Sequence, residues 1–429
     1  MSHQDETHQS GAPTNTLVSI TNCVHASASD TSSDTPTNCV YTSASQSFDD
    51  ETAAKREARQ RRYELQRTAA TLLRDVPHPR GREWRTVRCL LHFSGEAVAV
   101  RYSPSIARAS FAGACVCGSV WVCPVCSARI CELRRIEIAA AHTVHAAAGG
   151  SALFVTLTTP HDISDELSAL LGNRRKGGLR GLAGAMKRFR NDRQVKKLVE
   201  SLGRVGFIRA TEITRGANGW HPHFHELWLT DCPQDDRIRV HATEVLLNVW
   251  KRVSVMSGLD EPNARGVDLR WSWDASEYLS KIGHEQTWGS ARELASAATK
   301  RGRKTSRNAW QLLRAAGDGD RDAAEAFSEF AQATLGQRQL VWARGLKAAL
   351  AIEDRTDEEL ARHVDEDSFV MSVIPANRWR ALLRLPYEWR AQVLDVAENG
   401  GPHAVSDFLD LLEVNPSQAR EFVRILLEV

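Results

Sequence analysis

The feature that most constrains the fold is a pair of strand-like runs on either side of a turn signal. GFIRATEIT and WHPHFHELWLT flank the segment RGANG, which contains Asn218 followed by Gly219. Residues of the β-branched and aromatic types favour strands, and Asn-Gly between two such runs is a strong hairpin signal. We therefore predict an antiparallel hairpin over residues 206–230.

Three histidines follow the strand period in the second run. His221, His223 and His225 occupy alternate positions, so in an extended chain all three side chains project from one face. This pattern is typical of a metal site. The alternative is that one imidazole packs in the core while another hydrogen-bonds a carbonyl group.

The hairpin loop decides whether a carboxylate joins the histidines. A two-residue loop of Asn218-Gly219 places Glu212 opposite His225, and a four-residue loop of Gly216–Gly219 places it opposite His223. A three-residue loop would turn Glu212 to the other face. Imidazole and carboxylate together, with open positions, suit a divalent ion such as Mg²⁺ or Mn²⁺.

A second metal site is indicated by the cysteines. Nine are present, and most lie between Cys89 and Cys131. The CxxC motif of Cys123 and Cys126 presents two thiolates to one Zn²⁺, and Cys117 supplies a third. The fourth ligand is Cys115 or Cys89. Free thiols are the alternative reading of this cluster.

The chain of 429 residues is long enough for two or three compact units. The order of strand-like and helical segments predicts an α+β fold with a largely antiparallel sheet. The predicted divisions are a disordered Ser/Thr-rich tail (1–50), a basic helix (51–86), a cysteine-rich zinc-binding segment (87–135), an α+β domain (136–290) and a helical C-terminal region (291–429).

Charge and hydropathy bear on the partners. The formal net charge is only +2, so we expect any contact with phosphate to depend on local clusters of basic residues. Such clusters are Arg174, Arg175 and Lys176; Lys187, Arg188 and Arg190; Lys300, Arg301, Arg303 and Lys304. Solvated surface is the alternative for each. Neither a membrane-length apolar run nor a secretory pattern is seen, so we expect a cytoplasmic protein without a membrane partner.

A helical segment downstream, WDASEYLSK, places three polar side chains on one face. Asp274 and Tyr278 are four residues apart, and Lys281 follows three residues later. A helical tyrosine alone is more often part of an apolar core. Beside a metal-binding strand, Tyr278 becomes a candidate nucleophile, and Lys281 is placed to stabilise negative charge.

These motifs together resemble a known group of enzymes. HPHFH, the upstream FVTLTTP, the downstream YLSK and the cysteine run CGSVWVCPVCSARI are similar to the HUH endonucleases. The likeness is to the plasmid rolling-circle replication initiators of the single-tyrosine group, of actinobacterial type, and covers about residues 87–360. It implies an HUH nickase domain with a central antiparallel sheet and flanking helices.

The resemblance also implies roles for individual residues. His223 and His225 match the metal pair of the family, with Glu212 as an additional ligand and His221 as its alternative. Tyr278 matches the tyrosine that attacks the scissile phosphate, which leaves a 5′-phosphotyrosyl link and a free 3′-OH primer. The family places a carboxylate one helical turn before this tyrosine; here Asp274 has that spacing, and Glu277 is adjacent to the tyrosine.

The implied partners are plasmid origin DNA, single-stranded at the nick, and the host helicase and replication machinery. The implied cofactors are catalytic Mg²⁺ or Mn²⁺ and structural Zn²⁺. Alternatives are an HUH relaxase, a single-strand transposase, or a non-catalytic zinc-stabilised DNA-binding regulator. A relaxase usually carries its tyrosine ahead of the histidines, whereas Tyr278 follows them.

Overall fold

The computed structural model describes residues 42–93, 95–172, 179–271 and 306–428. Several predictions fall outside these residues: the tail before Thr42, the helical segment with Asp274, Glu277, Tyr278 and Lys281, and the basic clusters at 174–176 and 300–304. Apart from the first turns of helix α1, the elements below belong to the unit Asp49–Val429.

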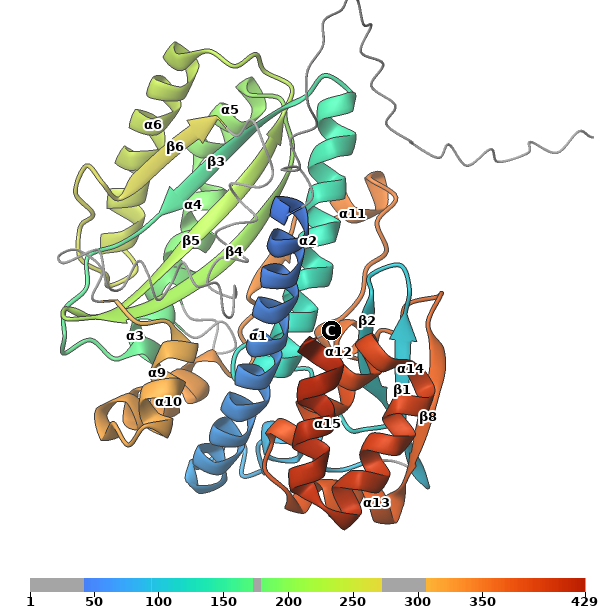
Figure 1. The fold of residues 1–429 in the computed structure, drawn as a ribbon. Coiled ribbons are helices and arrows are strands. Elements are labelled where there is room, and N and C mark those ends of the chain that lie inside the picture. The colour runs from blue at the N-terminus through green and yellow to red at the C-terminus, as the bar shows by residue number, and fades with distance from the viewer. Residues whose placement is uncertain (1–41, 94, 173–178, 272–305, 429) are drawn as a thin grey trace, which may run out of the picture. The chain divides into compact units, whose positions relative to one another are not determined.

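A five-stranded antiparallel sheet carries the predicted hairpin (Figure 1). Its order is β6-β3-β5-β4-β7, with β5 at the centre. The strands are β3 (Ser151–Leu157), β4 (Arg204–Gly216), β5 (Gly219–Thr230), β6 (Val267–Trp271) and β7 (Leu340–Trp342). The prediction of an α+β fold with a largely antiparallel sheet is confirmed.

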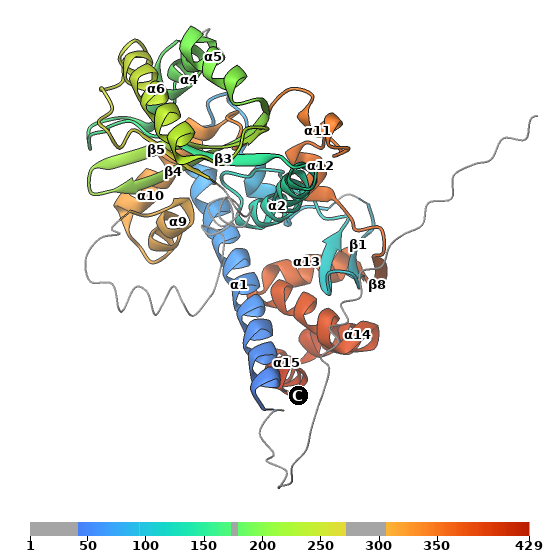
Figure 2. The ribbon, with the colours of Figure 1, turned by 90° about the horizontal axis from the view of Figure 1, so that it is seen from above.

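Helices cover both faces of this sheet (Figure 2). On one face lie α4 (Gly181–Asn191), α5 (Arg193–Ser201) and α6 (Asp236–Val255), and the short α3 (Leu167–Leu171) packs beside α4. On the other, Ile138 of α2 (Pro124–Ala147) packs with Phe154 and Leu227. Strand β5 is therefore buried on both sides. Among the helices that the structure describes, none combines the length and apolar character that a membrane span requires.

A second sheet joins the cysteine-rich segment to the C-terminal region. It has the order β2-β1-β8, with β1 (Ala97–Ser103), β2 (Arg108–Ala112) and β8 (Phe369–Pro375). The C-terminal region, predicted to be helical, also contributes two strands, because β7 and β8 each extend a sheet formed by residues far upstream. The helices of this region are α9 (Ala309–Gly317), α10 (Arg321–Thr334), α11 (Leu346–Ala349), α12 (Asp357–Arg362), α13 (Ala376–Arg384), α14 (Glu388–Val414) and α15 (Pro416–Glu428).

Helix α1 (Thr42–Asp75) differs from the basic helix predicted over 51–86. It begins and ends earlier, and a short 3₁₀ turn, η1 (Arg85–Arg88), follows. One side of α1 is buried in the core through apolar residues such as Tyr63 and Leu73. The same packing buries Arg59, which pairs with Asp395 and Glu398 of α14. Part of the basic character of α1 therefore serves packing.

We predict that Arg59→Met destabilises the fold by about 3–5 kcal/mol at pH 7.5, because it leaves the fully buried Asp395 without its cation. Burial raises the pKa of Asp395 to about 6. A raised carboxyl pKa means that the folded state takes up a proton as the pH falls, so the penalty should be smaller at pH 5. Denaturant unfolding at both pH values measures this difference.

The matched control is Arg61→Met. Arg61 pairs with the half-exposed Glu57 one turn away on the same helix, and such pairs contribute about 0.5 kcal/mol or less. Equal destabilisation by both variants would contradict the role assigned to the buried pair.

Candidate metal centres

The hairpin register brings a carboxylate to the histidine face. Gly216 pairs with Gly219, so the turn is Ala217-Asn218, and Glu212 lies directly opposite His223. This pairing is the one predicted for a four-residue loop, and the register predicted for an Asn218-Gly219 loop is wrong. Gly219 is required where it stands, since its φ is +87° and a Cβ there would lie 2.6 Å from a backbone oxygen of Asp162.

Three donor atoms converge on this face. The Oε2 atom of Glu212 lies 2.9 Å from Nε2 of His223 and 2.7 Å from Nε2 of His225. The two Nε2 atoms are 3.0 Å apart. Both histidines are buried, while Glu212 is partly exposed. The structure thus assembles three of the four residues expected to bind a divalent ion.

The other ring nitrogens determine which atoms are free to bind a metal. His223 Nδ1 lies 3.3 Å from the carbonyl oxygen of His221, which can only accept, so Nδ1 carries the hydrogen. In the neutral ring Nε2 then bears a lone pair. His225 Nδ1 lies 3.1 Å from the hydroxyl of Thr156 on the neighbouring strand. Such contacts on the second nitrogen are typical of metal-binding histidines.

The spacing of these donors fits a small divalent ion. Ligands bound at about 2.1 Å in adjacent octahedral positions lie about 3.0 Å from one another. The three separations between the donor atoms, 2.7, 2.9 and 3.0 Å, have this size. Three acceptors at such distances repel one another unless a proton or a cation lies among them. The donor set therefore suits Mg²⁺, Mn²⁺ or a similar ion.

His221 lies beside this group without joining it. Its Nε2 atom is 2.6 Å from the hydroxyl of Thr158, and its ring stacks between His161 and His223. Burial, followed by the charge of His223, lowers the pKa of His221 to about 4. The geometry therefore gives His221 a supporting position and favours Glu212 as the third donor.

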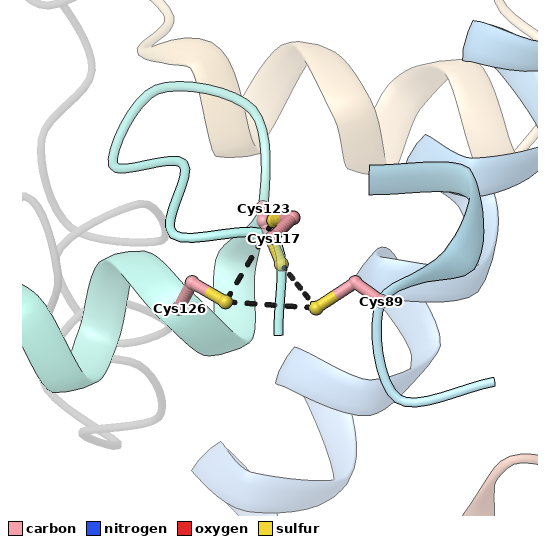
Figure 3. Close-up of side chains that lie close together, drawn as sticks. All are labelled: Cys89, Cys117, Cys123 and Cys126. Carbon is pink, nitrogen blue, oxygen red and sulfur yellow. Dashed lines mark hydrogen bonds between the residues drawn. The ribbon is translucent and has the colours of Figure 1, made fainter. Parts of the chain in front are cut away.

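Four cysteines form a second donor group (Figure 3). Cys89, Cys117, Cys123 and Cys126 are buried, and their sulfur atoms all lie within 4.8 Å of one another. Three of the separations are 3.5, 3.6 and 3.7 Å. Tetrahedral Zn²⁺ with Zn–S bonds of about 2.3 Å requires S···S distances of about 3.8 Å. The group therefore fits one Zn²⁺ ion.

The electrostatics of this group also favour a cation. Hydrogen bonding with Cys123 and Cys126 holds the pKa of Cys117 well below its usual range, whereas burial raises the pKa of Cys123. Four buried thiolates cannot coexist without positive charge among them. The exposed Cys115 lies outside the group, and the structure resolves the open choice of fourth sulfur in favour of Cys89.

The two donor groups are connected by helix α2. The helix follows Cys123 directly and contains Cys126. About two turns later, Arg134 of the same helix lines a pocket with Glu212 and His225. Trp121, from the loop between Cys117 and Cys123, lines the same pocket. Its indole stacks edge-on against Phe330 of α10 and donates to the carbonyl of Gln337.

The sequence alone does not identify Thr156, Trp121 and Arg134 as residues of the site. Thr156 pairs across the sheet with His225, which the strand pattern could have indicated once β3 was placed next to β5. No local signal marks Trp121 or Arg134. Trp220 and Trp228, which flank the histidines, are buried, as expected of core residues.

Two known proteins are similar to this chain. "Protein rep" of Streptomyces lividans is 29% identical over 356 residues, which cover 68% of this chain and 78% of that protein. The chain is thus similar to an actinobacterial Rep protein. The likeness to Rep proteins expected from the motifs is thereby confirmed.

The second relative of this Rep-like chain is "Neomycin resistance protein" of Streptomyces cyanogenus. It is 35% identical over 131 residues, and the match covers 26% of this chain and 30% of that protein. No family model matches the chain. No solved structure matches it either.

Proposed function

We propose that this Rep-like chain initiates plasmid replication by nicking one strand of the origin with Tyr278. Kinship with a Rep protein supports replication initiation. The observation that carries the nicking activity is the convergence of Glu212, His223 and His225 on a single point of the sheet. On this proposal residues 136–290 form an HUH nickase domain, and the four cysteines hold a structural Zn²⁺.

The proposed reaction is a transfer of one phosphodiester bond. The Tyr278 oxygen forms a bond to phosphorus while the bond to the 3′ oxygen breaks, and that oxygen takes up a proton to become the 3′-OH primer. When bound, a divalent ion supplies positive charge that polarises the scissile phosphate. The phenol, with a pKa near 10, passes its proton to Asp274 or Glu277, and Lys281 stabilises the developing negative charge.

Rejoining reverses these steps. A 3′-OH attacks the phosphorus of the phosphotyrosyl link and gives up its proton to water. The bond from phosphorus to the Tyr278 oxygen breaks, and that oxygen takes back a proton from the same carboxylate. The partners that follow are origin DNA, single-stranded at the nick, and the host helicase and replication machinery. The alternatives are an HUH relaxase, a single-strand transposase and a non-catalytic regulator. The cleavage assay and Tyr278→Phe test the last of these.

The test is cleavage of a labelled single-stranded origin oligonucleotide in Mn²⁺. We predict that His225→Ala lowers the rate by roughly 10³-fold, since a Lewis-acid contribution of several kcal/mol is lost and each 1.36 kcal/mol changes a rate tenfold. The control is His241→Ala, because His241 is exposed on α6. Equal rates for His225→Ala and wild type would overturn the proposal.

A further inference from the structure

A large cavity lies away from the histidine site. Its volume is about 1450 Å³, and its walls come from α1, the stretch around Cys89, strand β2, the start of α2 and the end of α12. Pockets for small ligands have volumes of roughly 300–1,000 Å³. The cavity is therefore larger than a mononucleotide or a simple anion requires.

The walls are strongly basic. Nine of the lining residues are Lys or Arg, against the two carboxylates of Glu132 and Asp365. Several of these cations have partners in the protein, such as Arg59 with Asp395 and Arg135 with Glu132. The net positive charge of the cavity therefore comes from the Lys and Arg side chains that are not neutralised in this way.

Arg62 is the clearest of them. It lies partly buried on α1, and the carboxylate that acts on it, Glu398, is already paired with Arg59. Burial, and then the neighbouring charges of Arg59 and Arg108, lower its pKa to about 10. A cation in such surroundings is destabilised unless an anion approaches it.

Arg108 lies on a second wall, in β2, and its side chain is exposed. Its charge acts on Glu132, but Glu132 is already paired with Arg135. Arginine on two walls of one cavity matches a ligand with repeated negative charge. Phosphates of a nucleic-acid backbone have that character.

Much of the remaining lining is apolar. Leu90, Phe93, Phe111 and Leu394 contribute to the same cavity. A duplex encloses its bases and presents mainly phosphate and sugar, whereas a single strand exposes base faces as well. Basic grooves with aromatic and apolar walls are typical of single-strand binding.

We propose that this cavity, bounded by Arg62 of α1 and Arg108 of β2, binds a single DNA strand. The phosphates contact the two arginines, and the bases contact the apolar wall that includes Phe93 and Phe111. The inference rests on the proposed function for the source of the strand, since nicking and unwinding at an origin release one.

The test measures the affinity of the whole chain for a fluorescein-labelled oligo-dT strand. Binding is monitored by fluorescence anisotropy at salt concentrations between about 50 and 300 mM. For single strands the logarithm of the affinity falls with the logarithm of the salt concentration by about 0.7 per phosphate contact. We expect Arg62→Met and Arg108→Met each to lower this slope by about 0.7 and to weaken binding severalfold at low salt.

Three controls make the result decisive. Arg237→Met removes the same charge from a side chain that is 93% exposed at the start of α6 and lines neither cavity, so its slope should equal that of wild type. Arg62→Met should keep or raise the melting temperature, because a poorly compensated cation is removed. Arg108 is exposed, so its variant still tests the cavity if Arg62→Met fails to fold.

Unchanged slopes in both variants would overturn the inference, as would equal competition by dTMP or by a duplex of the same length. The binding assay does not require cleavage. A chain that binds the strand through Arg62 and Arg108 yet forms no tyrosyl adduct contradicts only the proposed nicking activity. A chain that nicks while both variants bind like wild type contradicts only the proposed strand site.

Discussion

Tyr278→Phe is expected to abolish the covalent protein–DNA adduct and the release of a 3′-OH, while leaving Mn²⁺ binding unchanged. The substitution removes only the phenolic oxygen, so no bond to phosphorus can form. The metal-binding donors are on β4 and β5 and remain in place. The measurement is a denaturing gel of labelled origin oligonucleotide after incubation with Mn²⁺, scored for the adduct and for the cleaved strand.

Tyr102→Phe is the matched control, because Tyr102 lies in the three-stranded sheet and its ring packs against Phe369. This variant should form adduct at the rate of wild type. An adduct that persists in Tyr278→Phe and disappears in another tyrosine variant would reassign the nucleophile. Cleavage without any adduct would point to attack by water and contradict a phosphotyrosyl intermediate.

The second large effect is expected from Cys126→Ser. Zinc sites of this kind contribute roughly 10 kcal/mol or more of binding free energy to folding in small domains. Loss of one thiolate should release the ion, loosen the loop between Cys117 and Cys123, and expose Trp121. Because Trp121 and the α2 residue Arg134 line the pocket of Glu212 and His225, cleavage should also fall.

Zinc content measured by mass spectrometry, thermal unfolding and the red shift of tryptophan emission report these changes together. Cys115→Ser is the control, since Cys115 is exposed and outside the cluster, and it should retain one zinc per chain. If Cys115→Ser lost zinc while Cys126→Ser retained it, the assignment of the four ligands would be wrong.

The histidine hairpin could be predicted because its information is local. Alternating residues fix which side chains share a face, and the Asn-Gly signal fixes that the chain reverses. The register required one further fact, the pairing of Gly216 with Gly219, since either even-numbered loop satisfied the pattern. A single shift of the turn decides whether Glu212 faces His223 or His225.

A zinc-binding cysteine group could be predicted from the sequence, but its fourth ligand could not be identified. The CxxC spacing identifies Cys123 and Cys126, whereas the choice of Cys89 depends on how a distant stretch folds back. The side chain of Gln66 on α1 donates to the carbonyl of Cys89 and helps to hold that stretch. This kind of long-range contact leaves no pattern in the local sequence.

Strands β7 and β8 and the burial of Arg59 could not be predicted for the same reason. FVMSVIP has residues that favour strands, yet its partner β1 lies more than two hundred residues upstream. Arg59 is one of several arginines on α1, and only the position of Asp395 distinguishes it from its neighbours. Tertiary packing outweighs local charge at such positions.

We propose that Glu212, His223 and His225 together bind a catalytic divalent ion. Pulsed electron paramagnetic resonance of the chain with one equivalent of Mn²⁺ tests it most directly, because imidazole nitrogens bound to Mn²⁺ modulate the electron spin echo. We expect coupling to two such nitrogens in wild type and to at most one in His225→Ala. Mn²⁺ bound without any coupled imidazole nitrogen would contradict it.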